Sequence, residues 1–237
     1  MEVRGAMRTW SKERAWLILA VVSILIYGGY EAARAAVASR TVVVAHYGSL
    51  VWVEEKLFGA PVYYYASLHA NPVLDAMSSV IYSLHPAYFL AFLVYLAARR
   101  QRDFASALIA FTASSVAAIA VYSLYPTAPP WIALPFVERR PDYIVKAFSG
   151  LFGSHVDPNP YAAFPSMHVC VATLFAVYLC RATGRRLAYL WPLAMALATM
   201  YTGNHYLVDV LAGAALAVAS VRIGDAAAER IMARLSL

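Results

Sequence analysis

Residues 104–125 read FASALIAFTASSVAAIAVYSLY, a run of 22 residues without a charged side chain. A helix of this length is roughly 33 Å long, enough to cross the roughly 30 Å hydrocarbon core of a bilayer. Pro126 follows directly, and a helix ends there because proline lacks a backbone N–H. The stretch therefore predicts a transmembrane helix, and it sets the expectation of an all-α membrane fold.

The composition of the whole chain is typical of a membrane protein. Its 237 residues are 62% hydrophobic and only 14% charged, with a mean hydropathy of +0.61. A soluble domain averages about 25% charged residues, so this composition excludes a soluble Rossmann-type enzyme and a large separate ectodomain. We expect a single membrane-embedded domain over residues 1–237.

Further apolar runs lie on both sides of this stretch. Charged residues bound them, because a charge at bilayer depth is costly and usually marks the end of a span or a site. The last three runs are short or borderline for the typical 20-residue span. Together the runs predict a polytopic, all-α bundle of six transmembrane helices: Ala15–Ala36, Asp75–Ala98, Phe104–Tyr125, Ser166–Cys180, Leu187–Thr202 and Tyr206–Ile223.

Two connecting segments differ from the spans in composition. Val43–Asn71 mixes aromatic and charged residues, which favours an amphipathic segment lying in the headgroup region. Residues 126–165 contain eight prolines, so no long helix can run through them. We expect a structured loop there.

The basic residues indicate how the bundle is oriented. With six spans, thirteen Lys and Arg residues fall on the side of both termini and five on the other side. The positive-inside rule then predicts cytoplasmic termini and an extracytoplasmic proline-rich loop, on the same face as the start of the sixth span. Topology explains the net charge of +6, so we expect no nucleic-acid partner.

Two histidines and one aspartate are the candidate catalytic residues. His205 and Asp209 lie four residues apart, so on a helix the carboxylate can accept the proton of imidazole Nδ1 and leave the other nitrogen free. A lone membrane histidine is often a packing residue, but an aspartate one turn away favours a functional pair. His168 begins another span beside Ser166, where free backbone N–H groups can bind an anion. The set predicts phosphoryl transfer through a phosphohistidine.

Three segments resemble the signature motifs of the type 2 phosphatidic acid phosphatase (PAP2) superfamily. They are residues 125–131 (YPTAPPW), 165–168 (PSMH) and 205–209 (HYLVD). They look closest to the inositol phosphorylceramide synthase branch, in which a proline-proline motif replaces the first basic motif. The resemblance extends in order from Tyr30 and Arg34 to Gly213, and implies a six-helix bundle of PAP2 type with an interfacial amphipathic segment.

The resemblance implies roles for individual residues. His205 is the expected nucleophile, Asp209 orients it, and His168 is the acid that then becomes the base activating the acceptor. No cofactor or metal is implied. The residues expected to bind substrate are Ser166, Arg34, Tyr125 and Asn204.

Departures from the family pattern indicate the type of substrate. The lipid monoester phosphatases that the chain resembles carry a Lys and an Arg in the first motif and an Arg six positions before the nucleophile. Here the first segment ends in Trp131, and Thr199 occupies the later position. A phosphomonoester is close to dianionic at neutral pH and a diester carries one charge, so the missing cations favour a diester donor. We expect transfer of an inositol-phosphate-like head group between lipids, with a phospholipid and a hydroxyl acceptor as partners.

Several alternatives stay open from the sequence. The protein could be a plain lipid phosphate phosphatase with water as acceptor, a small proton-coupled transporter, or an inactive scaffold. Arg34 is expected either to contact phosphate or to pair with Glu31 or headgroups, and His85 either lines the cavity or makes an interhelical hydrogen bond. Arg139, Arg140 and Lys146 are expected to face solvent or headgroups. We expect an integral protein of the plasma membrane with an extracytoplasmic active site.

Overall fold

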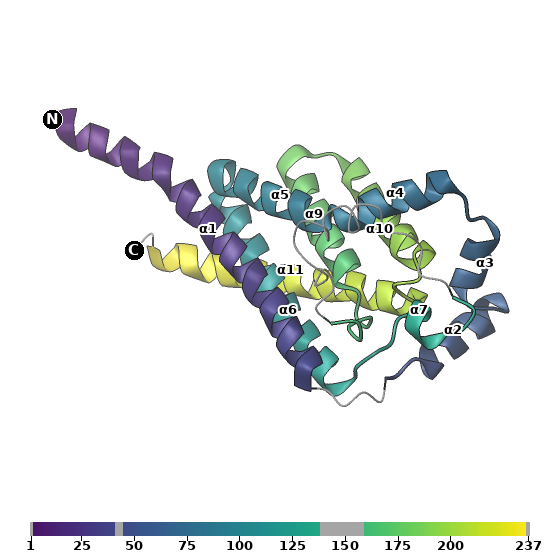
Figure 1. Cartoon of the computed structure of the whole chain (residues 1–237). Coiled ribbons are helices and arrows are strands. Elements are labelled where there is room, and N and C mark those ends of the chain that lie inside the picture. Colours follow the sequence, from purple (N-terminus) through teal and green to yellow (C-terminus); the bar gives the residue numbers. More distant parts are fainter. Residues whose placement is uncertain (1, 41–44, 138–158, 236–237) are drawn as a thin grey trace.

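The chain forms a helical bundle whose two ends lie on one side of the molecule, opposite the short helices α2, α3 and α7 (Figure 1). The computed structural model describes residues 2–40, 45–137 and 159–235. Its elements within those ranges are α1 (Glu2–Arg40), α2 (Gly48–Phe58), α3 (Val62–Leu68), α4 (Pro72–Ser83), α5 (His85–Arg99), α6 (Gln101–Leu124), α7 (Pro130–Ala133), α9 (Met167–Thr183), the 3-10 helix η1 (Arg186–Tyr189), α10 (Leu190–Tyr201) and α11 (Leu207–Leu235).

Three helices in the described part of the chain are long and apolar enough to cross a membrane. Their apolar stretches are Leu17–Ser39, Gln101–Leu124 and Leu207–Arg234. The expected third span is confirmed as α6, which ends just before Tyr125 and Pro126. Helices α1 and α11 extend beyond the expected first and sixth spans, into stretches of sequence that carry charged residues.

Six full spans are not confirmed. The expected fourth and fifth spans correspond to α9, with 17 residues, and to α10, with 12 residues. At 1.5 Å per residue these helices are roughly 26 Å and 18 Å long, below the usual length of a spanning helix. Ser166 begins α9 as its N-cap, and Gly184 ends it in the left-handed conformation. The bundle thus combines long helices with shorter ones that begin or end inside it.

The expected second span, Asp75–Ala98, corresponds to a bent pair of helices rather than to one continuous helix. It consists of α4 and α5, which meet at Leu84 with a bend of 43°. Pro86 has no N–H to donate to the carbonyl oxygen of Tyr82, so the helical ladder breaks there. The ring nitrogen Nδ1 of His85 lies 3.2 Å from that oxygen and satisfies it instead. Counted as one broken span, this pair makes a fourth candidate crossing in the described residues.

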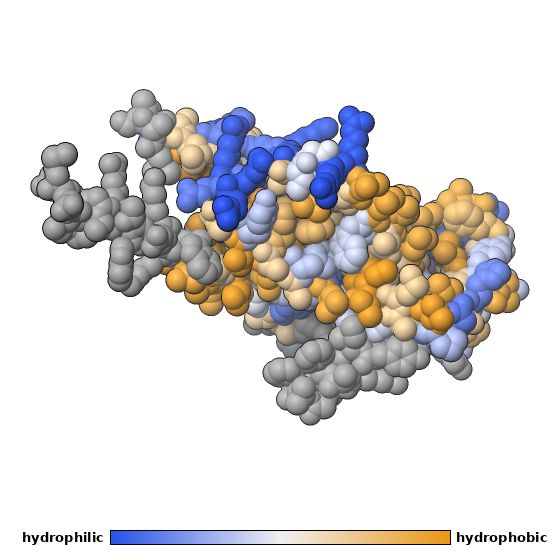
Figure 2. Space-filling model, turned by 90° about the horizontal axis from the view of Figure 1, so that it is seen from above, coloured by the Kyte–Doolittle hydropathy of each residue, from blue (hydrophilic) through white to orange (hydrophobic). Residues whose placement is uncertain are grey.

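The core forms where the long helices pack together. Helix α11 packs along α6 and α9, α1 packs against α5 and α6, and α10 packs against α9 and α4. Aromatic rings fill the contact between α1 and α6, where Tyr27 stacks on Phe111 with 5.8 Å between ring centroids and Tyr30 meets the same ring edge-on. Figure 2 shows that apolar residues cover much of one face, with hydrophilic residues gathered toward its edges. This surface fits a protein surrounded by lipid.

Ion pairs hold the far end of α11 against its neighbours. Arg181 binds both carboxylate oxygens of Asp225, at 2.7 and 2.8 Å, and Ser106 donates to the same carboxylate at 2.6 Å. Arg102 pairs with Glu229 at 2.7 Å. These contacts join α6, α9 and α11 at the end of the bundle that carries most of the basic residues.

The segment expected to be interfacial is helical but does not cross the bundle. It forms α2 and α3, of 11 and 7 residues, separated by Gly59 in the left-handed conformation. The proline-rich segment contains only the four-residue helix α7 in its described part, as its prolines predict. Its strand-like contacts are two isolated bridges that join His46, Thr127 and Ala162. Arg139, Arg140, Lys146 and His155 lie outside the described residues.

Two glycines of α11 allow close approach of other backbones. A Cβ atom at Gly224 would overlap the carbonyl oxygen of Ser106 on α6, and a Cβ atom at Gly213 would overlap the carbonyl oxygen of Ser166 at the start of α9. The helices can therefore cross this closely only because both positions lack a side chain.

The Gly224 crossing generates a stability prediction. Replacing Gly224 with alanine forces α11 away from α6, and we expect a cost of about 1–3 kcal/mol and a lower melting temperature in detergent. Gly29→Ala is the matched control, because a Cβ atom there has no neighbour within 4 Å. It should leave the melting temperature unchanged or raise it slightly. Equal melting temperatures for the two variants would contradict the close packing.

Candidate active site

The candidate site forms where the N-termini of α9 and α11 meet. The Ser166 side chain accepts from the N–H of Val169 and caps α9, while its own N–H donates to the carbonyl of Asp209 at 3.0 Å. The N–H of His205 donates to the carbonyl of Thr199, at the end of α10. Backbone hydrogen bonds thus hold the second and third sequence motifs together.

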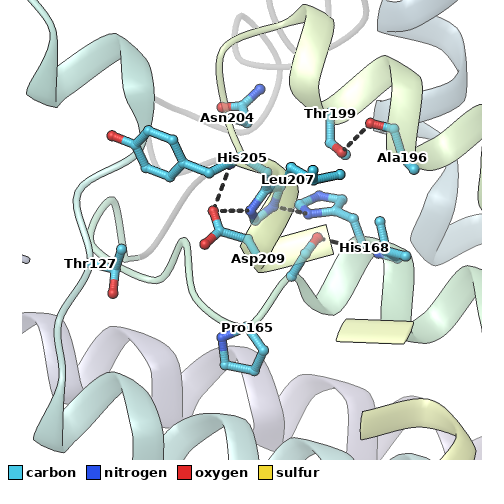
Figure 3. Close-up of polar contacts among 12 residues, drawn as sticks. Thr127, Pro165, His168, Ala196, Thr199, Asn204, His205, Leu207 and Asp209 are labelled. Atoms are coloured by element: carbon cyan, nitrogen blue, oxygen red, sulfur yellow. Dashed lines mark hydrogen bonds and ion pairs between the residues drawn. The ribbon is translucent and has the colours of Figure 1, made fainter. Parts of the chain in front are cut away.

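The structure brings together the three predicted catalytic side chains (Figure 3). Nε2 of His205 lies 3.3 Å from Nδ1 of His168, and Nδ1 of His205 lies 3.5 Å from Oδ2 of Asp209. The second distance is longer than a good hydrogen bond, as is common for catalytic contacts without substrate. A proton on Nδ1 facing the carboxylate leaves a lone pair on Nε2, which accepts from His168. This geometry would suit a nucleophile placed between an orienting carboxylate and an acid.

Asp209 has a second contact that fixes the start of α11. Its Oδ2 accepts from the N–H of Tyr206 at 2.8 Å, so the third residue of the helix caps the residue before the helix. The Asp209 side chain is fully buried. The same carboxylate therefore stabilises the helix end and faces His205.

His168 is packed between rings from the bent second span. The Tyr82 ring stacks on it with 4.2 Å between centroids, and the His85 ring lies 4.3 Å away. Nδ1 of His85 carries a proton, because the Tyr82 carbonyl oxygen only accepts, so Nε2 accepts from the Tyr27 hydroxyl at 3.3 Å. Both alternatives for His85 therefore hold, since it lines the cavity and also makes an interhelical hydrogen bond.

Arg34 is the cation that faces the two histidines in the described cavity. It lines the same cavity as His168 and His205, while its Nη1 donates to Glu31 at 2.9 Å. The two readings of Arg34 are thus compatible, because the ion pair holds the guanidinium at the cavity wall. Its charge is partly balanced by Glu31, which also lines the cavity.

The four predicted substrate-binding residues divide into two pairs. Arg34 and Asn204 line the cavity. Ser166 is fully buried as the cap of α9 and is not among the cavity-lining residues. The Tyr125 ring stacks on His46 at 4.0 Å, and its hydroxyl lies 3.3 Å from that of Ser49, so the structure does not bring this ring to the cavity either.

Sequence reasoning missed several cavity residues. Tyr82 precedes the proline break, and Tyr122 lies in the last turn of α6, and both positions are outside the three motifs. Trp131 and Asn159 line the cavity from the proline-rich segment, on the two sides of the undescribed residues. Buried Glu54 was also missed, because its segment was expected to lie at the surface. No group of three His, Cys, Asp or Glu side chains in the described residues could hold a metal ion.

Comparison with known proteins gives a family assignment. Searches of curated proteins and of solved structures found no match to the chain. The model of the PAP2 superfamily matches residues 48–223, which include the three motifs. Because the match covers most of the chain, the protein belongs to the PAP2 superfamily, which in general comprises phosphatases and phosphotransferases.

Proposed function

We propose that the protein is a lipid phosphotransferase that acts at the extracytoplasmic face through a phosphohistidine on His205. The observation that carries the proposal is the 3.3 Å contact between His205 Nε2 and His168 Nδ1, with Asp209 on the other side of His205. A nucleophile, an acid and an orienting carboxylate on two helix N-termini can perform phosphoryl transfer without a metal or cofactor.

The reaction has two steps. His205 Nε2 attacks the phosphorus of a lipid phosphodiester, the bond from phosphorus to the lipid alcohol oxygen breaks, and His168 gives that oxygen its proton. The acceptor hydroxyl then gives its proton to His168 and attacks phosphorus, which breaks the bond between nitrogen and phosphorus and restores both imidazoles. Arg34 and the N-terminus of α9 stabilise the negative oxygens of the transferred group.

The charge of the described cavity favours a diester as donor. Arg34 is partnered by Glu31, so the Lys and Arg side chains that line the described cavity supply little net positive charge. A diester carries one negative charge and a monoester nearly two, so the positive charge of the cavity neutralises less of the charge of a monoester. This charge balance supports a diester donor, and with it the proposed inositol phosphorylceramide synthase-like branch. The proposed reaction transfers an inositol-phosphate-like head group, and we place it at the plasma membrane. Hydrolysis, with water as acceptor, is the alternative outcome.

The covalent intermediate can be tested directly. Incubation with phosphatidylinositol labelled in its phosphate should place label on His205, detectable by mass spectrometry of the peptide. His205→Ala should lose the label and at least about 10³-fold in turnover. His69→Ala is the control, because His69 is exposed on the outer segment and should retain both. Label on His205→Ala, or full turnover by that variant, would refute the nucleophile.

Donor and acceptor specificity separate a transferase from a phosphatase. We expect kcat/KM at least about 10-fold higher for phosphatidylinositol than for phosphatidic acid, a difference of about 1.4 kcal/mol. Adding a lipid with a free hydroxyl group should divert the product from inositol phosphate to a new diester. The transferase is wrong if phosphatidic acid releases phosphate rapidly while phosphatidylinositol stays intact, an outcome that would favour the phosphatase.

Arg34 should matter for the transferred group. Arg34→Ala removes the guanidinium at the cavity wall, and we expect kcat to fall about 10²-fold, as for loss of one stabilising donor. Arg99→Ala, an exposed arginine at the end of α5, should have no effect. Steady-state assays of both variants check this, and equal kcat values would remove Arg34 from the phosphate site.

A further inference from the structure

A buried carboxylate outside the motifs binds the start of the nucleophile's helix. Glu54 lies on α2, and only 1% of its surface is exposed. Its Oε1 accepts from the N–H of Leu207 at 2.6 Å, and its Oε2 accepts from the N–H of Val62 at 2.9 Å. Each oxygen therefore holds the first residue of a different helix, α11 and α3.

Burial of this carboxylate is costly unless it is well satisfied. Burial raises the pKa of Glu54 above its ordinary value, while the two amide donors lower it. No lysine or arginine pairs with it in the described residues. Its partners are backbone groups at helix N-termini, where the helix dipole favours a negative charge.

The contact with Leu207 complements the contacts made by the motif. The first N–H groups of a helix have no partner within the helix. At α11, Asp209 satisfies the N–H of Tyr206, and Glu54 satisfies the N–H of Leu207 from another element. His205 precedes these two residues directly, so the path of its backbone depends on both carboxylates.

We propose that Glu54 is a positioning residue, which fixes the first turn of α11 so that His205 is aligned with His168 and the phosphate. This inference rests on the proposed phosphotransfer. It also gives α2 a role, because exposed Trp52, Leu57 and Phe58 on the same helix suit the headgroup region. Glu54 thus links a lipid-facing helix to the nucleophile.

The test compares Glu54→Gln and Glu54→Ala with Glu55→Gln, an exposed neighbour on the same helix. Gln keeps the volume of Glu54 but has one acceptor oxygen for two amide donors. We expect kcat to fall about 10-fold in Glu54→Gln and about 100-fold in Glu54→Ala, with KM within twofold, because misplacing a catalytic group lowers the rate. Glu55→Gln should match the wild type.

Amide hydrogen exchange supplies a readout that does not need activity. Peptides covering residues 205–208 should exchange faster in Glu54→Gln than in the wild type or in Glu55→Gln, at an unchanged melting temperature. If Glu54→Ala does not fold, the kcat and the hydrogen exchange of Glu54→Gln alone test the positioning role. Wild-type kcat in Glu54→Gln, or a raised KM with unchanged kcat, would overturn the positioning role.

The two proposals fail differently. If the wild-type protein transfers no phosphoryl group from any lipid, the proposed function fails, and exchange at residues 205–208 still tests Glu54. Faster exchange in Glu54→Gln would then support the positioning of the α11 start, and unchanged exchange would overturn it.

Discussion

The geometry of the candidate site depends on one close crossing, where α11 passes the start of α9 at Gly213. A side chain at this position would overlap the carbonyl oxygen of Ser166, and the backbone hydrogen bond from Ser166 to Asp209 needs the same short separation. With the crossing fixed, His168 and His205 face each other from two helices. The two imidazoles lie on different helices, so their separation follows from how closely the two backbones approach each other.

A second constraint acts throughout the bundle, because a backbone polar group without a partner is costly where water is scarce. The chain meets it with side chains that also surround the site. His85 replaces the hydrogen bond that Pro86 removes, and Asp209 and Glu54 satisfy consecutive N–H groups at the start of α11. The polar residues near the cavity therefore stabilise the fold as well as surround the candidate site. For a variant of any of them, both activity and stability must be measured.

The sequence was sufficient for the features that depend on local pattern. The uncharged run of α6, the spacing of His205 and Asp209, and the helix start beside His168 all follow from residues close together in the chain. Features that depend on tertiary contacts were out of reach. The run from Asp75 to Ala98 was predicted as one span because hydropathy does not register the hydrogen-bonding defect at a proline. The burial of Glu54 was not predicted, because its partners are backbone amides 8 and 153 residues away. The predicted six spans rested on apolar runs, on the distribution of basic residues and on the family resemblance, and none of these separates short packed helices from spanning ones.

The direct contact between the two imidazoles has a consequence for the resting protein. In the proposed reaction, the Nε2 lone pair of His205 that attacks phosphorus first accepts a hydrogen bond from His168, so a bound ligand must separate the two rings before the attack. A lipid anchored by its acyl chains can contribute remote binding energy to that opening, whereas water or a small soluble phosphoester cannot. In the proposed reaction, the contact between His168 and His205 would thus itself limit turnover of ligands that cannot separate the two rings.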